Sequence, residues 1–195
     1  MPDAIKIGML FSSAIIEVVA NFLAKHAQNI PIVLDPVMVA KSGDQLLLPD
    51  AIDAMKTKLI PLATIITPNI PEAHSLVGNI ENLNELGEAL LKLGPKAVLL
   101  KGGHLVGTQS NDLFLDCSGS KVWLEAERIN SNNTHGTGCT LSAAICAGLA
   151  HGLTIFDACR NAKAYLSGAI RVARNNSVGK GHGPVHHFYN LWSKL

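Results

Sequence analysis

Residues 63–73 read ATIITPNIPEA. The short apolar run at 63–66 predicts a buried strand, and the polar turn Thr67-Pro68-Asn69 ends it. Pro71 then suits the first turn of a short helix, where a missing backbone N–H costs nothing. The stretch therefore predicts a strand that passes directly into a helix, with polar residues at the junction.

The same order of strand and helix recurs along the chain. Alternating strands and helices predict an α/β fold, with a mostly parallel sheet and helices on both of its faces. Further apolar runs predict strands at 5–10, 31–34 and 97–100, and helical patterns are found at 13–28, about 49–59 and 83–93.

The second half of the chain is predicted to add a hairpin and more helices. The hairpin surrounds Ser118-Gly119-Ser120 and would form one edge of the sheet. Its strands are expected at 111–117 and 121–127, and helices at 137–151, 154–175 and around Phe188, Tyr189, Leu191 and Trp192. The helix at 13–28 is expected to carry an apolar side of Ile15, Val18, Val19, Phe22 and Leu23.

Composition narrows the class of protein. The 195 residues are 48% hydrophobic and 16% charged, with a mean hydropathy of +0.25, which suits a sheet buried on both faces. A net charge of +1 gives no basis for expecting a nucleic acid or an acidic membrane as partner. No apolar run has membrane-spanning length, no signal peptide is apparent, and the four cysteines form no CxxC pair. We therefore expect a single cytoplasmic domain, residues 1–195, with free thiols.

Polar side chains follow three of the predicted strands where each strand ends. They are Asp35, Asn69 and Lys101. Ligands of parallel sheets bind beyond the carboxyl ends of the strands, so these side chains are expected to lie together. Asp35 and nearby Glu72 offer the oxygen ligands that Mg²⁺ prefers. Each residue alone also has a structural interpretation, because Asp and Asn often end turns, Glu favours helix N-termini and Lys is commonly solvated.

Residues 132–139 read NNTHGTGC and lead from a polar loop into a helix of small residues. The first N–H groups of a helix lack intrahelical acceptors, so Gly136, Thr137 and Gly138 could cradle a phosphate. Cys139 falls in the first turn, where it could accept a proton from an attacking hydroxyl. With Lys101 and a metal ion, these parts match the needs of phosphoryl transfer. An ordinary helix start with one buried cysteine is the alternative, and this motif alone does not decide between them.

Several motifs occur together in an order typical of one enzyme family. They are KIGML at 6–10, DPVMVAKSG at 35–43, TPNxxEA at 67–73, KGGH at 101–104, THGTGC at 134–139 and GHGPV at 181–185. By these motifs the whole chain resembles the hydroxymethylpyrimidine/phosphomethylpyrimidine kinases of thiamine biosynthesis, within the ribokinase-like superfamily. Most ribokinase-like sugar kinases carry Asp at the position of Cys139, whereas cysteine there points to the pyrimidine kinases and some pyridoxal kinases.

The resemblance implies a ribokinase-like three-layer α/β/α sandwich and an ATP- and Mg²⁺-dependent kinase. Such a kinase phosphorylates 4-amino-5-hydroxymethyl-2-methylpyrimidine and then its monophosphate, and the family habit implies a homodimer. Carried over by motif, Cys139 is the catalytic residue and Gly136, Thr137 and Gly138 form the anion hole. The remaining implied site residues are Asn69, Glu72, Lys101 and Thr137 for Mg-ATP, Asp35 and Glu72 for the metal, and Gly8, Met9 and Val37 for the pyrimidine.

The start of the chain departs from the family pattern. Family members normally have several dozen residues before the KIGML motif, where this chain has only five, so we expect either an N-terminal truncation or a gene model with a late start. The absent part would carry the first strand, a Gly-rich turn and polar contacts to the pyrimidine. Three interpretations therefore stay open: an active pyrimidine kinase, a pyridoxal kinase of the same superfamily, and a catalytically impaired nucleotide-binding protein.

Overall fold

The computed structural model describes residues 1–38, 46–48, 50–103, 105, 107–177 and 180–192. The predicted polar loop at 41–44 lies outside these residues. The second half of the DPVMVAKSG motif and the histidine of the KGGH motif lie outside them as well.

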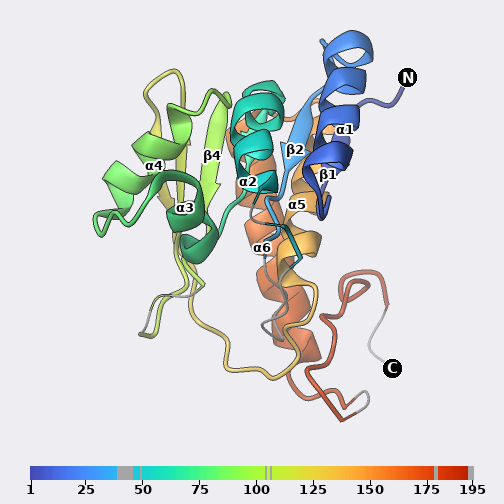
Figure 1. Ribbon diagram of the computed structural model, residues 1–195. Coiled ribbons are helices and arrows are strands. Elements are labelled where there is room, and N and C mark those ends of the chain that lie inside the picture. The colour runs from blue at the N-terminus through green and yellow to red at the C-terminus, as the bar shows by residue number, and fades with distance from the viewer. Residues whose placement is uncertain (39–45, 49, 104, 106, 178–179, 193–195) are drawn as a thin grey trace.

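In the described residues, six strands form one sheet in the order in which they occur along the chain (Figure 1). The first four run parallel, and the last two continue the sheet as an antiparallel hairpin. This arrangement confirms the predicted mostly parallel sheet with a hairpin at one edge. The strands are β1 (Ile5–Ile7), β2 (Ile32–Leu34), β3 (Ile65–Ile66), β4 (Ala97–Leu100), β5 (Asp112–Asp116) and β6 (Lys121–Leu124).

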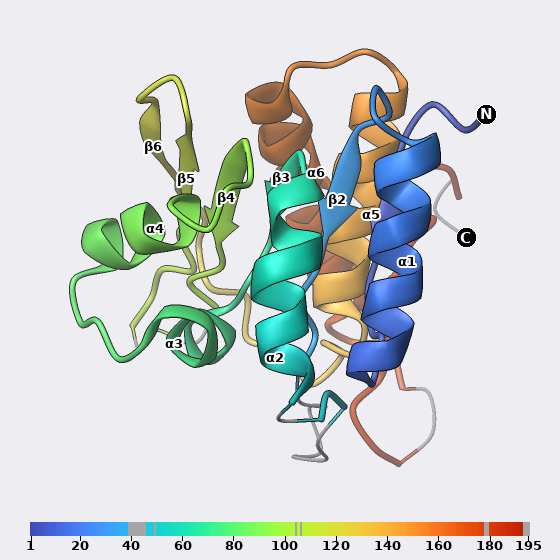
Figure 2. The same cartoon turned by 45° about the horizontal axis from the view of Figure 1, so that its top comes forward.

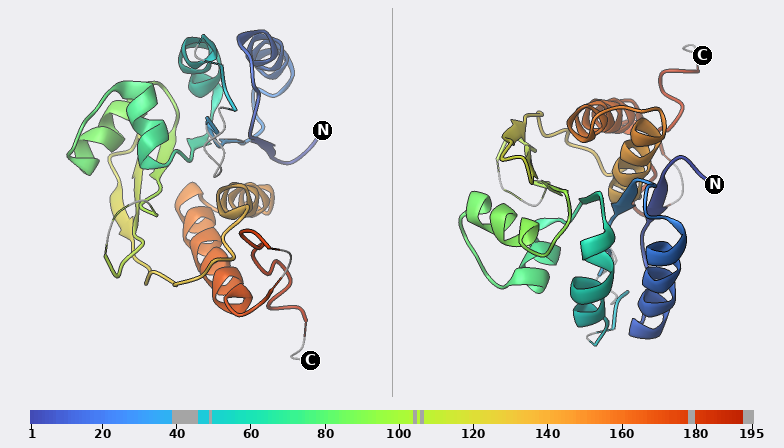
Figure 3. Two further views of the ribbon diagram at one scale, coloured as in Figure 1. Left: turned by 60° about the horizontal axis from the view of Figure 1, so that its bottom comes forward. Right: turned by 90° about the horizontal axis from the view of Figure 1, so that it is seen from above.

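Helices cover both faces of the sheet. Figure 3 shows α5 and α6 on one side and α1 to α4 on the other. They are α1 (Ser13–His26), α2 (Ala51–Ala54), α3 (Ile70–Val77), α4 (Leu83–Leu91), α5 (Thr137–Ala150) and α6 (Ile155–Ala173). The helix predicted at 49–59 is irregular, because a π-helical segment, Met55–Leu59, and a 3₁₀ turn, Ile60–Leu62, follow α2. Among the described residues, no helix combines the length and apolar character that crossing a membrane requires.

Strand side chains divide the hydrophobic core between the two faces. In β2, Leu34 packs among α1 to α4, whereas Val33 packs against α5 and α6. In β4, Val98 and Leu99 are divided in the same way, and all four side chains are fully buried. A parallel sheet needs helices over both faces, so this alternation confirms the predicted α/β/α layers.

The buried face of α1 agrees only in part with the predicted one, because Leu23 is buried and Val19 packs against the core but the other three residues do not. Ile16 and Leu23 are buried, but Ile15, Val18 and Phe22 are 45%, 70% and 60% exposed. Two apolar stripes run side by side on this helix, which lies beside α2 over the sheet (Figure 2). Periodicity reveals that a helix is apolar but does not choose between neighbouring stripes, because the contacts that choose are tertiary.

The predicted terminal helix is wrong. Residues 187–192 form turns, in which the rings of Phe188 and Trp192 stack at a centroid distance of 5.2 Å. Tyr189 instead packs against α6, where its ring occupies the space that a side chain at Gly168 would need. A segment this short gains too few helical hydrogen bonds to offset nucleation, so packing decides its shape.

The two faces of α1 can be compared by matched substitutions. Ile16→Ala is expected to lower the free energy of unfolding by roughly 2–5 kcal/mol, because it leaves a cavity in the core. Ile15→Ala should cost less than about 1 kcal/mol, because its side chain is half exposed. Urea denaturation measures both values, and equal losses would contradict the observed face.

Candidate active site

Three charged side chains from separate elements meet in one buried cluster. Asp35 directly follows β2, Lys101 directly follows β4, and Glu72 lies in the first turn of α3. The Lys101 Nζ atom lies 2.9 Å from Asp35 Oδ1 and 3.8 Å from Glu72 Oε2. The side chains of Lys101, Asp35 and Glu72 are only 15%, 2% and 8% exposed, so water screens their charges weakly. The structure thus brings together residues that the sequence placed at this edge of the sheet.

Neighbouring hydroxyls fix the Asp35 carboxylate in place. Thr67 donates a hydrogen bond to Asp35 Oδ1 at 3.2 Å, and Ser142 of α5 donates one to Oδ2 at 3.4 Å. Neither hydroxyl is among the site residues predicted from the sequence. Ser142 was detectable, because a residue four positions after Gly138 lies on the same side of the helix.

Asn69 and Glu72 form a reciprocal capping box at the start of α3. Asn69 Oδ1 accepts the Glu72 N–H at 2.8 Å, and Glu72 Oε2 accepts the Asn69 N–H at 2.7 Å. The structural interpretation of this pair is therefore correct, yet the same box holds the Glu72 carboxylate beside Lys101. The Asn69 Oδ1 atom is engaged in the cap, and through the cap Asn69 orients Glu72.

At the start of α5, the backbone of glycine residues lies directly beside the charged cluster, with no side chain between them. Gly136 precedes the helix with a φ of 78°, a left-handed conformation that glycine adopts without strain. A Cβ atom at Gly138 would lie 3.5 Å from Lys101 Nζ and 3.6 Å from Asp35 Oδ2. Cys139 follows in the first turn of the helix and is exposed rather than buried. The glycines therefore place helix N–H groups next to the cluster, and the alternative interpretation of Cys139 as a buried core residue is wrong.

Two distant motifs lie side by side at this helix start. The His135 N–H donates to the Gly183 carbonyl at 3.0 Å, which joins the THGTGC motif to the GHGPV motif. Thr140 Oγ1 lies 3.0 Å from a ring nitrogen of His187. The tail of the chain thus supports the loop that leads into α5.

The cluster carries one more negative charge than positive charge. Burial raises the pKa of Glu72, and neither the Lys101 ammonium nor the Asn69 N–H offsets that effect completely. Burial opposes the charge on Lys101, but the carboxylates of Asp35 and Glu72 outweigh it and raise the pKa of Lys101. Lys101 therefore stays protonated, whereas Glu72 would be stabilised by a further cation.

This charge balance fits a loosely held Mg²⁺ ion. The described residues contain no group of three acidic, histidine or cysteine side chains that could enclose a metal. Mg²⁺ commonly uses one or two carboxylates, with water and substrate phosphates as its other ligands. Asp35 and Glu72 match that smaller requirement, so the donor set suits Mg²⁺ bound together with a nucleotide.

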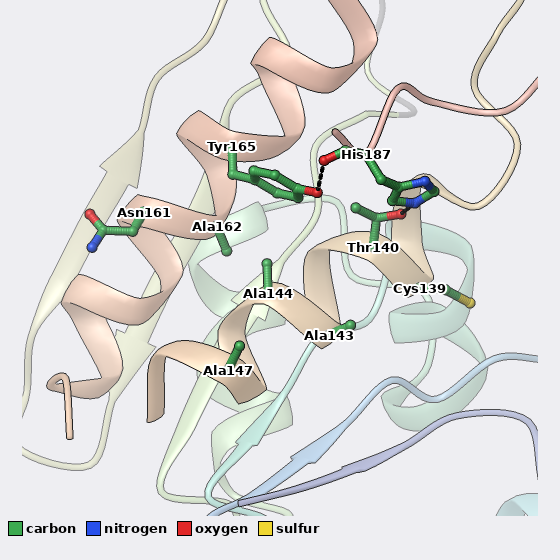
Figure 4. A pocket seen from close by; sticks show the side chains of 9 residues that line it. All are labelled: Cys139, Thr140, Ala143, Ala144, Ala147, Asn161, Ala162, Tyr165 and His187. Carbon is green, nitrogen blue, oxygen red and sulfur yellow. Dashed lines mark hydrogen bonds between the residues drawn. The ribbon is translucent and has the colours of Figure 1, made fainter. Parts of the chain in front are cut away.

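A cavity of about 570 Å³ opens between α5 and α6. Cys139 lies at one end of it, and Tyr165 and Asn161 line it from α6 (Figure 4). Its wall is mostly small apolar side chains of α5, and Figure 4 shows the Cys139 side chain directed away from Tyr165. None of the three charged cluster residues lines this cavity, but Cys139 does, so the cavity adjoins the start of α5 rather than the charged cluster.

The residues assigned to the pyrimidine follow the first two strands. Gly8 comes directly after β1, and Val37 lies three residues beyond β2, which pairs with β1 in parallel. Met9 is 56% exposed. The strand pairing therefore puts Gly8 and Val37 at the same edge of the sheet as Asp35.

Comparison with known proteins places this geometry in a family. The family model described as "Phosphomethylpyrimidine kinase" matches residues 1–186. A curated hydroxymethylpyrimidine/phosphomethylpyrimidine kinase from Rhizobium meliloti is 46% identical, over 97% of this chain and 72% of its own length. The Escherichia coli protein of the same name is 44% identical, over 97% of this chain and 73% of its own length.

Solved structures share the fold. The pyridoxal kinase from Staphylococcus aureus in complex with AMP-PCP and pyridoxal superposes with a TM-score of 0.84 at 34% identity, covering 97% of this chain and 69% of that one. The phosphomethylpyrimidine kinase from Clostridium difficile has a TM-score of 0.71 at 42% identity, covering 87% and 69%. These likenesses confirm the predicted ribokinase-like α/β fold. The family model spans nearly the whole sequence, and the chain therefore belongs to the phosphomethylpyrimidine kinase family.

Proposed function

We propose that the chain transfers the γ-phosphoryl group of ATP to 4-amino-5-hydroxymethyl-2-methylpyrimidine, and then to its monophosphate, in thiamine biosynthesis. The observation that carries this proposal is the Asp35, Lys101 and Glu72 cluster packed against the start of α5. Curated relatives at 44–46% identity bear the name of this activity. We further propose that residues 1–195 form one kinase domain.

The site residues divide the chemistry among them. The substrate hydroxymethyl oxygen forms a bond to the γ-phosphorus, the bond from that phosphorus to the β,γ-bridging oxygen breaks, and ADP leaves. Cys139 takes the proton of the attacking hydroxyl. The N–H groups of Thr137 and Gly138 and the Lys101 ammonium stabilise the charge on the transferring group. Gly136 shapes the turn that aims these N–H groups.

ATP and Mg²⁺ are the proposed co-substrate and cofactor. Solved relatives hold ADP or AMP-PCP, which supports a nucleotide site. Asp35 and Glu72 would hold Mg²⁺, and Asn69 would orient Glu72 through the capping box. The metal ion would supply positive charge that neutralises the phosphates. The homodimer and the cytoplasmic location stay predictions, which sedimentation and cell fractionation can measure.

Pyridoxal phosphorylation is the second candidate function. The observation that favours it is the superposition of pyridoxal kinases with TM-scores of 0.84–0.85. Their 34% identity is lower than that of the curated pyrimidine kinases, so the pyrimidine remains the preferred substrate. Gly8, Met9 and Val37 are the proposed contacts that select between the two rings.

Substrate choice can be tested directly. The purified chain should consume ATP when the pyrimidine or its monophosphate is added, and at least tenfold more slowly with pyridoxal. A coupled assay of ADP release measures all three rates. A higher rate with pyridoxal would favour the second candidate. A folded sample that Mg-ATP stabilises thermally, without turnover of any substrate, would support a catalytically impaired nucleotide-binding protein instead.

Cys139→Ala tests the proton acceptor. We expect kcat to fall by about 10²–10⁴-fold with little change in ATP affinity, because a base acts mainly in the transition state. Cys117→Ala is the matched control, because that cysteine is also exposed but lies in the β5–β6 turn. Steady-state kinetics and nucleotide titration measure both quantities. Equal losses in turnover and affinity would contradict the role of Cys139.

Glu72→Gln tests the cation site by activity. The Mg²⁺ concentration for half-maximal turnover should rise several-fold, since a neutral amide binds the ion less strongly than a carboxylate. Titration of Mg²⁺ at saturating ATP measures it. An unchanged Mg²⁺ requirement would remove Glu72 from the metal site.

The same variant has a pH-dependent signature in stability. Burial raises the Glu72 pKa above its ordinary value of 4.5, so the folded chain binds this proton more tightly than the unfolded chain. The charged carboxylate therefore costs stability that the neutral amide does not. Glu72→Gln should gain thermal stability relative to wild type as the pH rises above about 4.5, and show no gain in acid. Melting curves across pH measure the difference, and a gain confined to acid would contradict it.

A further inference from the structure

A second buried ion pair lies behind the charged cluster. Lys163 of α6 donates to Asp112 Oδ2 at 2.7 Å, and its Nζ atom also donates to the Ser110 carbonyl. The Lys163 and Asp112 side chains are only 12% and 5% exposed. None of the site motifs contains either residue.

The other oxygen of Asp112 reaches the turn that follows Lys101. Asp112 Oδ1 accepts the Gly102 N–H at 2.9 Å in a buried hydrogen bond. The turn fits closely there, because a Cβ atom at Gly102 would lie only 1.8 Å from the Asn111 carbonyl oxygen. The carboxylate of Asp112 thus joins α6 to the residue next to Lys101.

Hydrogen bonds consequently fix the backbone at Lys101 and at the residue that follows it. Its own N–H donates to the Pro68 carbonyl at 2.9 Å, and the next N–H, of Gly102, is held by Asp112. Asp112 is not free to turn away, because Lys163 holds its second oxygen. Loss of the contact between Lys163 and Asp112 is therefore expected to move this turn and displace the Lys101 side chain.

Stability alone is a weak reason for such a pair. Two buried charges lose their hydration, and replacing a buried ion pair by apolar side chains is often neutral or stabilising. The exposed pairs Lys58–Glu17 and Lys121–Glu88 do not incur that loss, because their side chains are 41–50% exposed. The buried pair has a geometric consequence that the exposed pairs lack, namely the fixed turn beside Lys101.

We propose that Asp112 and Lys163 are positioning residues, which hold the turn after β4 so that the Lys101 ammonium meets the transferring phosphoryl group. The inference rests on the proposed function of Lys101 in that step. Positioning of this kind affects rate strongly, because a displacement of about 1 Å can cost up to roughly 10²-fold in turnover. It acts through Lys101 and does not require contact with either substrate.

A double-variant kinetic experiment tests the proposal. In the otherwise native chain, Lys163→Met should lower kcat by about tenfold or more, with KM for the pyrimidine changed less than about twofold. In a Lys101→Met background, the same substitution should lower kcat by less than about twofold, since the group that it positions is already gone. Lys163→Arg should recover most of the lost kcat, because Arg retains the charge and the donors.

Two further variants separate positioning from folding. Leu90→Ala removes a fully buried side chain of α4 and serves as a destabilised control, which should keep a near-native kcat at a temperature where it is folded. If Lys163→Met does not fold, Asp112→Asn replaces it in the same pair of backgrounds. Asn keeps an oxygen for the Gly102 N–H but weakens the hold on Lys163, so a smaller loss of kcat is expected, again absent without Lys101.

The outcomes are distinct. The positioning role would be overturned if Lys163→Met lowered kcat by the same factor in the Lys101→Met background as in the otherwise native chain. It would also be overturned if Leu90→Ala lowered kcat as much as Lys163→Met does. Either result would leave the proposed function intact. The kcat of the single variant Lys101→Met tests the role of Lys101 separately. A near-native value would overturn that role.

Discussion

Lys101 is largely buried, with its ammonium group between two carboxylates, and the geometry of the site depends on this contact. The bond to Asp35 joins the ends of β2 and β4, which lie on either side of β3. Parallel pairing of the three strands brings the carboxyl ends of β2 and β4 to the same edge of the sheet, where this bond forms. Because a buried charge without a partner would be costly, the ion pair and the sheet order stabilise each other.

The start of α5 adds anion-binding N–H groups to the charged cluster at the strand ends. A buried cluster with a net negative charge does not by itself attract phosphate. The helix N-terminus adds N–H groups beside it, at Gly138, where no side chain intervenes. A nucleotide with a bound cation would meet both requirements, because the carboxylates would hold the cation and the N–H groups would hold a phosphate. Cys139 is exposed at this boundary, within reach of solvent.

The fold and the choice of substrate depend on different parts of the chain. Pyridoxal kinases and a pyrimidine kinase both superpose on this structure, so the sheet and its helices do not distinguish the two rings. We propose that the residues around the first two strand ends, namely Gly8, Met9 and Val37, make this distinction. Family membership is carried by overall identity, whereas specificity is decided by a few contacts.

The sequence determined the order of strands and helices, the edge hairpin and the polar strand ends, because these follow from local periodicity and turn residues. It also supplied the residues of the cluster, but not their contacts. Tertiary structure alone decided which stripe of α1 is buried, that Thr67 and Ser142 hold Asp35, and that the end of the chain forms turns. Each of these depends on contacts between residues far apart in the chain, and local sequence patterns do not encode such distances.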